Sequence, residues 1–264
     1  MVSQDLSALR RRTAIIVRTL VEQFDHVEME DEDRPRFTES LVATILSQNT
    51  TDANSNRAYA ALRARYRTWR SVARAPHSAL VETIRVAGLA EAKARTIRTA
   101  LETIHRETGG YDPDEFTEGD EELLARLTSI PGVGLKTAAC VLMFALGRDV
   151  CAVDTHVHRI ANRLGLVQTS TPDRTFRALA PLLPPGHARR AHVAMILFGR
   201  QICKAQRPHC FECPVFTLCE WPERHRFALE MRPGAAPASG NLLLLEVIRG
   251  GAEAAAGTRR KRTK

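Results

Sequence analysis

Aromatic side chains are scarce in this chain, where Phe, Trp and Tyr make up 5% of 264 residues. Proteins that bind single strands of nucleic acid stack successive bases on aromatic rings, so the composition does not favour that class. Long apolar runs are missing as well, and no stretch reaches the roughly 20 residues that a membrane-spanning helix needs. We therefore expect neither a base-stacking platform nor a contact with membranes.

A recognisable secretion signal is also missing. Residues 1–17 read MVSQDLSALRRRTAIIV, in which the arginines precede only a very short apolar patch and no small-residue cleavage site follows. We expect a cytoplasmic protein, in a compartment that keeps thiols reduced. The formal net charge of +8 weakly favours a polyanionic partner, and a basic protein without such a partner is the alternative.

Alternating β patterns are nearly absent, and apolar residues recur at helical spacing along most of the chain. The segment 41–46 is one example, with Thr38 expected as its N-cap. The run VCAV at 150–153 is the main strand-like string, and we interpret it as a short buried connector. The pattern predicts an all-α fold of many short helices. A length of 264 residues allows one large or two modest domains, and a hydrophobic content of 44% is enough for a real core.

Four of the six cysteines lie close together with the spacing C-x6-C-x2-C-x5-C, at Cys203, Cys210, Cys213 and Cys219. Thiolates at such short spacing are typical of a zinc site or an iron–sulfur cluster. Disulfides are the competing interpretation, and they fit poorly with a reducing compartment. The spacing alone does not separate zinc from iron.

A glycine-rich turn joins two apolar helical segments within residues 127–147, LTSIPGVGLKTAACVLMFALG. The pattern predicts a helix that ends near Ile130, a tight turn over residues 131–134 and a second helix from about Leu135. Glycines leave backbone N–H groups uncovered at such a helix N-terminus, which suits an anion such as a DNA phosphate. An ordinary helix–helix turn is the alternative.

Lys136 falls in the first turn of that second helix, where the helix dipole disfavours a positive charge. A lysine that readily gives up its proton can act as an amine nucleophile and form a Schiff base. A surface lysine that grips phosphate is the alternative. Further along, residues 152–166, AVDTHVHRIANRLGL, predict a helix with Asp154 as its N-cap. Beyond capping, this carboxylate is a candidate for assisting proton transfer beside Lys136.

Three blocks therefore occur in order: P-G-V-G-x-K-T-A, A-V-D-T-H-V-x-R-I-x-N-R-L and the cysteine spacing. Together they resemble the endonuclease III family of DNA glycosylases, over about residues 15–225. The resemblance implies two helical domains with a DNA-binding cleft between them and a [4Fe–4S] cluster on the four cysteines. The expected boundaries are a six-helix barrel domain at 30–148 with its helix-hairpin-helix at about 124–146, a cluster-bearing domain at 1–29 plus 149–227, and a flexible basic tail at 228–264.

The resemblance also implies an activity, that of a bifunctional glycosylase and AP lyase of base excision repair. The expected partner is double-stranded DNA with a damaged base or an abasic site, bound by a monomer that is cytoplasmic and associates with the nucleoid when on DNA. An oxidised pyrimidine would be flipped out of the duplex. Lys136 would attack C1′, displace the base and form a Schiff base that leads to β-elimination. Asp154 would stabilise the developing charge on the sugar.

Two loops are expected to fill the space that the flipped base leaves. Many family members read S-A-Q-A-T-D where this chain reads S-Q-N-T-T-D, so an ungapped match puts Asn49 in the place of the wedge glutamine. Gln48 substitutes for it if the loop shifts, and Leu89 resembles the family's apolar wedge. Ordinary loop polarity and core packing are the alternatives. The expected DNA contacts are Gln48, Asn49, Leu89, Gly132, Val133, Gly134, Thr137, His156 and Lys204.

Other functions stay open at this point. The altered loop favours a mismatch-type thymine or uracil glycosylase on the same fold. A non-catalytic iron–sulfur protein that binds DNA and a zinc-ribbon-like binding module are two further alternatives. The basic segments 10–12 and 259–262 are expected to be solvated charge, and contact with phosphate is the alternative.

Overall fold

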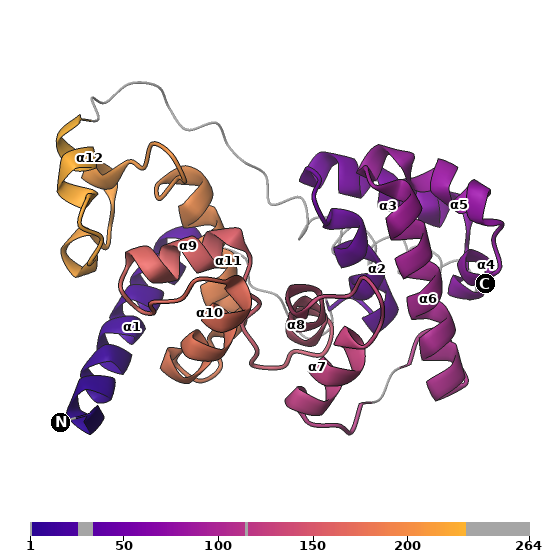
Figure 1. Cartoon of the computed structure of the whole chain (residues 1–264), viewed down its shortest axis with the longest axis horizontal. Helices are drawn as coiled ribbons and strands as arrows, with labels where there is room; N and C mark the ends of the chain where they lie inside the picture. Colours follow the sequence, from indigo (N-terminus) through magenta and orange to yellow (C-terminus); the bar gives the residue numbers. More distant parts are fainter. Residues whose placement is uncertain (1, 26–33, 114–115, 231–264) are drawn as a thin grey trace, which may run out of the picture. The chain divides into compact units, whose positions relative to one another are not determined.

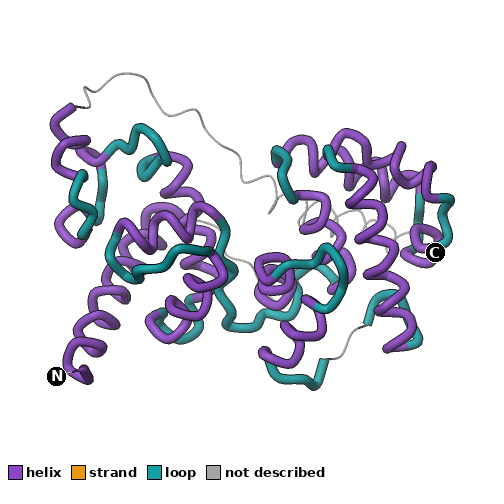
Figure 2. Tube along the Cα trace, viewed as in Figure 1, coloured by secondary structure: helices purple, strands orange, loops and turns teal. Residues whose placement is uncertain are grey.

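The structure is a computed structural model that describes residues 2–25, 34–113 and 116–230. All regular secondary structure in these ranges is helical (Figures 1 and 2), which confirms the predicted all-α fold class. None of the described helices is both long enough and apolar enough to cross a bilayer. The described residues fall into two compact units, formed by residues 2–25 with 149–230 and by residues 34–113 with 116–148.

The first unit is built on helix α1 (Val2–Phe24), which packs along α11 (Ala188–Gln201). The rings of Phe24 and Phe198 meet at this contact with their centroids 5.6 Å apart. Helix α9 (Thr155–Arg163) packs on α11 as well. The remaining elements of this unit are α10 (Pro172–Leu179), η3 (Ala180–Leu182), η4 (Cys210–Glu212), η5 (Phe216–Leu218) and α12 (Arg224–Glu230).

The second unit surrounds α2 (Phe37–Ser47), which packs against α3 (Asp52–Arg65), α6 (Ala90–Thr108) and α8 (Leu135–Phe144). Most of α2 is buried, and α8 is buried continuously from Thr137 to its end. A helix that is apolar all round belongs in the middle of a core, which explains the central position of α2. The unit also contains α4 (Trp69–Ala73), α5 (His77–Ile84), η2 (Arg85–Ala87) and α7 (Asp120–Thr128).

The prediction that Thr38 caps α2 is wrong. The helix begins at Phe37, and its N-cap position is Arg36, which makes no side-chain cap hydrogen bond. The backbone N–H of Thr38 instead donates to Asp112 Oδ1 at 3.1 Å, and the Thr38 hydroxyl donates to the carbonyl of Tyr111 at 2.7 Å. A carboxylate from a distant segment therefore satisfies the helix N-terminus.

Two other sequence-based expectations concern the connector at 150–153 and the C-terminal tail. Residues 150–153 form no regular element and are buried, which confirms the predicted connector. The predicted basic tail begins at residue 228, but residues 228–230 are the last turn of α12. The rest of that tail, including the basic segment 259–262, lies outside the described residues.

Candidate active site and metal centre

The turn between α7 and α8 has a conformation that requires glycine. Gly132 has a φ of +89°, and a Cβ atom built there would overlap the Thr96 hydroxyl oxygen on α6 and lie 3.0 Å from Thr96 Cγ2. The side chain of Val133 is 4% exposed and anchors the turn in the core. Gly132 and Gly134 are exposed. The turn therefore presents its backbone to solvent at the N-terminus of α8, as the sequence predicted.

Lys136 is half-buried in the first turn of α8. Thr137 follows it and is 3% exposed, and its hydroxyl accepts a hydrogen bond from Gln48 Nε2 at 3.1 Å. The same Gln48 nitrogen donates to the carbonyl of Gly132 at 3.3 Å. Gln48 thus links the loop after α2 to the turn. The side chains of Thr137 and Val133 are buried, and the backbone N–H of Val133 donates to the carbonyl of Ile130 at 3.0 Å. A contact of Thr137 with DNA would therefore go through its backbone N–H, whereas Val133 serves to anchor the turn.

The two loops expected to enter DNA share a feature that the sequence did not reveal. Asn49 and Leu89 both have left-handed backbone conformations, with φ of +49° and +48°, and they are the non-glycine residues with positive φ among those described. Asparagine tolerates this region, whereas it is strained for leucine. Leu89 is also 60% exposed. Both residues are therefore exposed on left-handed backbone, which is strained at Leu89, as a residue placed for contact with a ligand often is.

The chain contains five lysines, at positions 93, 136, 204, 261 and 264. Lys93 is 3% exposed, and its Nζ donates to the carbonyls of Leu46 and Ala87, each at 2.8 Å. Lys204 belongs to the first unit, where its Nζ lies 3.4 Å from His209 Nε2. The last two lysines lie outside the described residues. Among the described lysines, Lys136 alone combines partial exposure with a helix N-terminus.

Asp154 is the N-cap of α9, as predicted, and its Oδ1 accepts from the N–H of Val157 at 2.8 Å. The buried connector before it is fixed by His192 on α11. The Nδ1–H of His192, which is 3% exposed, donates to the carbonyl of Ala152 at 2.7 Å. His192 was not predicted from the sequence. Its position inside the apolar run AHVAMILF was the available signal, because a buried histidine needs a hydrogen-bond partner.

Two further expected DNA contacts lie near the cysteine loop. His156 is half-buried on α9, with its Nδ1 3.2 Å from Arg159 Nη2. Arg159 also donates to the carbonyls of Gly199 at 3.2 Å and Cys203 at 2.9 Å. Helix α9 is therefore tied to the segment that carries the first cysteine. Lys204 follows that cysteine and is half-buried.

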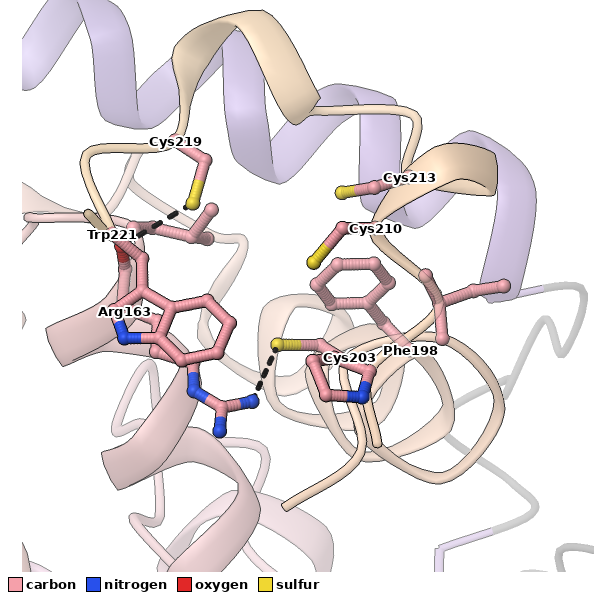
Figure 3. Close-up of a pocket in the computed structure, with 10 residues that line it drawn as sticks. Arg163, Phe198, Cys203, Cys210, Cys213, Cys219 and Trp221 are labelled. Carbon is pink, nitrogen blue, oxygen red and sulfur yellow. Dashed lines mark hydrogen bonds between the residues drawn. The ribbon is translucent and has the colours of Figure 1, made fainter. Parts of the chain in front are cut away.

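The four cysteines line one cavity in the first unit (Figure 3). Helix α9 contributes Arg163, whose Nη1 donates to Cys203 Sγ at 3.6 Å, and Cys219 Sγ lies 3.3 Å from the carbonyl of Arg163. The rest of the lining is mostly apolar and consists of Leu164, Phe198, Ile202, Pro208 and Trp221. The predicted cluster of cysteines is thus brought together in space.

Arg163 supports this cavity beyond its contact with sulfur. Its guanidinium donates to the carbonyls of Lys204 at 2.7 Å and Ala205 at 2.8 Å, and it lies 4.1 Å from the centre of the Trp221 ring. Planar guanidinium groups suit such combined hydrogen bonding and stacking. Arg163 was not predicted as part of the site, because the carbonyls that it binds are 41 and 42 residues away in the sequence.

Arg12 also differs from expectation, because it is not solvated charge. Its Nη2 donates to the carbonyls of Leu164 at 2.9 Å and Gly165 at 2.8 Å, and it forms an ion pair with Glu220, beside Cys219. The N-terminal helix therefore holds the end of α9 and the end of the cysteine loop together.

The electrostatics of the cavity disfavour free thiolates. Burial raises the pKa of Cys210 to about 11 and of Cys213 to about 12, and it also raises the pKa of Cys219. Burial therefore favours the protonated thiols, and a metal cation that bound here would displace those protons. Backbone N–H groups of Val215 and Trp221 face the sulfurs of Cys213 and Cys219, which is the kind of hydrogen bonding that iron–sulfur ligands accept.

Three or more potential ligands close enough to hold a single metal ion do not occur in the described part of the chain. A tetrahedral zinc ion needs all its sulfurs about 2.3 Å away. The four cysteines nevertheless line one cavity, so the choice between a zinc ion and an iron–sulfur cluster stays a prediction.

Comparison with known proteins gives the family. The model of the HhH-GPD superfamily base excision DNA repair proteins matches residues 42–185. Endonuclease III of Thermotoga maritima is 41% identical over 184 residues, which cover 70% of this chain and 83% of that protein. Among solved structures, a non-covalent endonuclease III–DNA complex has a TM-score of 0.68 and a trapped covalent endonuclease III–DNA intermediate one of 0.67. Each is 31% identical and covers 80% of this chain and 95% of its own. The chain therefore belongs to the HhH-GPD superfamily and, within it, to the endonuclease III family of base excision repair proteins.

Proposed function

We propose that this protein is a bifunctional DNA glycosylase and AP lyase that removes oxidised pyrimidines from double-stranded DNA, as a cytoplasmic monomer. The observation that carries the proposal is the position of Lys136 in the first turn of α8, directly after the exposed glycine turn. The family relative trapped as a covalent DNA intermediate supports covalent chemistry. A covalent adduct that survives trapping is the expected product of an amine nucleophile.

In the proposed reaction, the neutral amine of Lys136 attacks C1′ of a nucleotide flipped out of the duplex. The bond from C1′ to the base breaks, and its electron pair leaves with the base, which takes up a proton. The C1′–O4′ bond then opens, O4′ takes up a proton, and an iminium forms between C1′ and Nζ. Loss of a C2′ proton expels the 3′ phosphate by breaking the C3′–O3′ bond. Water finally hydrolyses the imine and regenerates Lys136.

Asp154 is assigned two tasks in this sequence. Its carboxylate stabilises the positive charge that develops on the sugar as the base leaves, and it relays protons to and from the sugar. The cap hydrogen bond from Val157 N–H to Oδ1 supports this assignment, because it fixes the orientation of the carboxylate while lone pairs remain to meet substrate.

DNA binding is assigned to backbone and loop groups. The N–H groups at the start of α8 suit a phosphate oxygen, because they lie at the positive end of a helix dipole. Gly132 and Gly134 bear no side chain that would screen those groups. Asn49 and Leu89 are assigned to the space that the flipped base leaves. The exposure of Leu89 supports this role, since a large apolar side chain gains from entering a base stack.

Cys203, Cys210, Cys213 and Cys219 are assigned as ligands of a [4Fe–4S] cluster. When bound, the cluster supplies four iron–sulfur bonds that fix the loop carrying Lys204. The chain's own contribution is the apolar wall and the N–H···S contacts around the cavity. The hydrogen bonds from Arg163 to the carbonyls of residues 204 and 205 support a structural role for this loop rather than a role in the reaction at C1′.

The experiment is reductive trapping with borohydride on duplexes that bear thymine glycol, dihydrouracil, uracil, a T:G mismatch or an abasic site. The wild type is expected to cut and trap the oxidised pyrimidines and the abasic site. Lys136→Gln is expected to lose trapping, whereas Lys204→Gln, the matched control, keeps it and binds DNA more weakly. Preference for uracil and T:G would favour the mismatch-type alternative. Binding to lesions without any cleavage would favour the non-catalytic one.

A further inference from the structure

Lys93 is a buried cation without a carboxylate partner in the part of the chain that the structure describes. Its side chain is 3% exposed, and its Nζ donates to the carbonyls of Leu46 and Ala87, each at 2.8 Å. Burial lowers its pKa. An apolar side chain of the same length would occupy this place without the cost of desolvating a charge. The lysine therefore needs an explanation other than core filling.

Its two acceptors are the ends of two helices. Leu46 lies in the last turn of α2, and Ala87 is the last residue of η2. Carbonyls at helix ends have no partner within the helix, and the dipole makes these ends favourable for a cation. One ammonium group thus satisfies two helix-end carbonyls, at residues 46 and 87, which are 41 residues apart in the sequence.

Each acceptor directly precedes one of the two loops with left-handed residues. Asn49 comes three residues after Leu46, and Leu89 comes two residues after Ala87. Each of these exposed residues therefore lies within three residues of a carbonyl that accepts a hydrogen bond from Lys93. Moving the ammonium would release both loops at once.

The same face of α6 also meets the glycine turn. Thr96, one turn along the helix from Lys93, is the residue whose side chain a Cβ at Gly132 would overlap. Gln48 joins the loop of Asn49 to the same turn, since its Nε2 donates to Gly132 O at 3.3 Å and to Thr137 Oγ1 at 3.1 Å. Both loops and the turn are therefore connected through the first two turns of α6.

We propose that Lys93 is a positioning residue that holds the loops of Asn49 and Leu89 at a fixed spacing, so that both enter the duplex together when a nucleotide is flipped. This inference rests on the proposed function. It assigns Lys93 to the opening of the duplex and not to the chemistry at C1′, which belongs to Lys136. Lys93 acts through the two loops and does not itself touch DNA.

The test separates duplex opening from chemistry with two substrates in single turnover. A duplex with thymine glycol requires the base to be flipped and its place filled, whereas a single-stranded abasic oligonucleotide requires neither. The probe variant is Lys93→Met, which keeps the length of the side chain and removes the donors. The matched control is Leu101→Ala, which opens a cavity in the same helix at a fully buried position. A 2-aminopurine beside the lesion reports base unstacking by fluorescence.

Lys93→Met is expected to lose roughly tenfold to a hundredfold in the rate of duplex excision, because small misplacements of positioning groups cost that much. Its cleavage and trapping of single-stranded abasic DNA should stay within about twofold of wild type, and the 2-aminopurine signal should fall. Leu101→Ala should lower the unfolding temperature without this selective loss. If Lys93→Met does not fold, Lys93→Gln is judged by the same ratio of duplex to single-strand rates.

Three results would overturn the inference: duplex excision by the Lys93 variant at the wild-type rate, equal losses on both substrates, or the same duplex-selective loss in Leu101→Ala. Each leaves the proposed function standing, because wild-type trapping is scored in the same assay. A wild-type protein that neither excises nor traps would refute the proposed function and this inference with it.

Discussion

The glycine turn before α8 makes a quantitative prediction for Gly132→Ala. Alanine at a φ of +89° is strained by about 1–2 kcal/mol. Its Cβ would also overlap the Thr96 hydroxyl, and overpacking of this kind costs about 1–3 kcal/mol. Alanine also lowers the conformational entropy of the unfolded chain, which offsets about 0.4–1 kcal/mol of this destabilisation. We expect a net loss of about 3 kcal/mol in the free energy of unfolding.

The assay is urea denaturation followed by circular dichroism, run as a double-mutant cycle with Thr96→Ala. Removing the Thr96 side chain should recover the overpacking part, about 1–3 kcal/mol, but not the strain of the left-handed backbone. The matched control is Gly110→Ala, where a Cβ meets nothing within 4 Å, and it should gain about 0.4–1 kcal/mol from the restricted unfolded chain alone. A Gly132→Ala protein as stable as wild type, or a cycle with no coupling to Thr96, would refute the argument that this turn requires glycine.

Three further predictions concern single side chains. Asp154→Asn should slow single-turnover excision by about 10²–10⁴-fold while stability and DNA affinity are kept, because asparagine caps helices as well as aspartate does; an unchanged rate would contradict the assigned role. Cys213→Ser should abolish the visible absorption of the cluster and lower both the unfolding temperature and DNA affinity, and a stable, fully active protein without iron would argue against that structural role. Burial raises the pKa of Glu39 above its ordinary value of 4.5, so its folded state holds the proton more tightly than the unfolded state. The stability from that proton is present below pH 4.5 and lost as the pH rises through the folded pKa. Glu39→Gln should therefore raise the unfolding temperature at pH 7 and leave it unchanged below about pH 4; equal unfolding temperatures of variant and wild type at pH 7 would contradict this.

Local sequence patterns were sufficient for the features whose partners are close in the chain. Asp154 caps α9 through the N–H of Val157, three residues later, and glycine at 132 is required by the φ of that residue. Such features depend on a few neighbouring dihedral angles and hydrogen bonds, so the order of residues determines them.

Features that depend on distant partners were not predictable in this way. Thr38 was a reasonable N-cap by type, but Asp112 supplies the carboxylate from 74 residues away. Arg12 looked like solvated charge, yet it binds carbonyls at the end of α9. Helical spacing shows which side chains share a face, but it does not show which distant backbone group meets that face.

The burial of Lys93 was not predicted, although the sequence carries a signal for it. It stands four residues before Ile97 and eight before Leu101, on the stripe that faces the core. A lysine on such a stripe is a signal of a buried amine, because charged side chains are almost never fully buried without a partner. Its partners, Leu46 and Ala87, are known only from the fold.

The central claim is that Lys136 forms the covalent bond to DNA. The most direct measurement is to trap the enzyme on an abasic duplex with borohydride, digest the product with trypsin and locate the adduct by mass spectrometry. The account predicts one modified peptide that spans residues 127–148, bounded by Arg126 and Arg148, with the sugar adduct on Lys136 and no cleavage after it. An adduct on Lys204, on Lys93 or on the N-terminal amine, with residue 136 unmodified, would contradict the account.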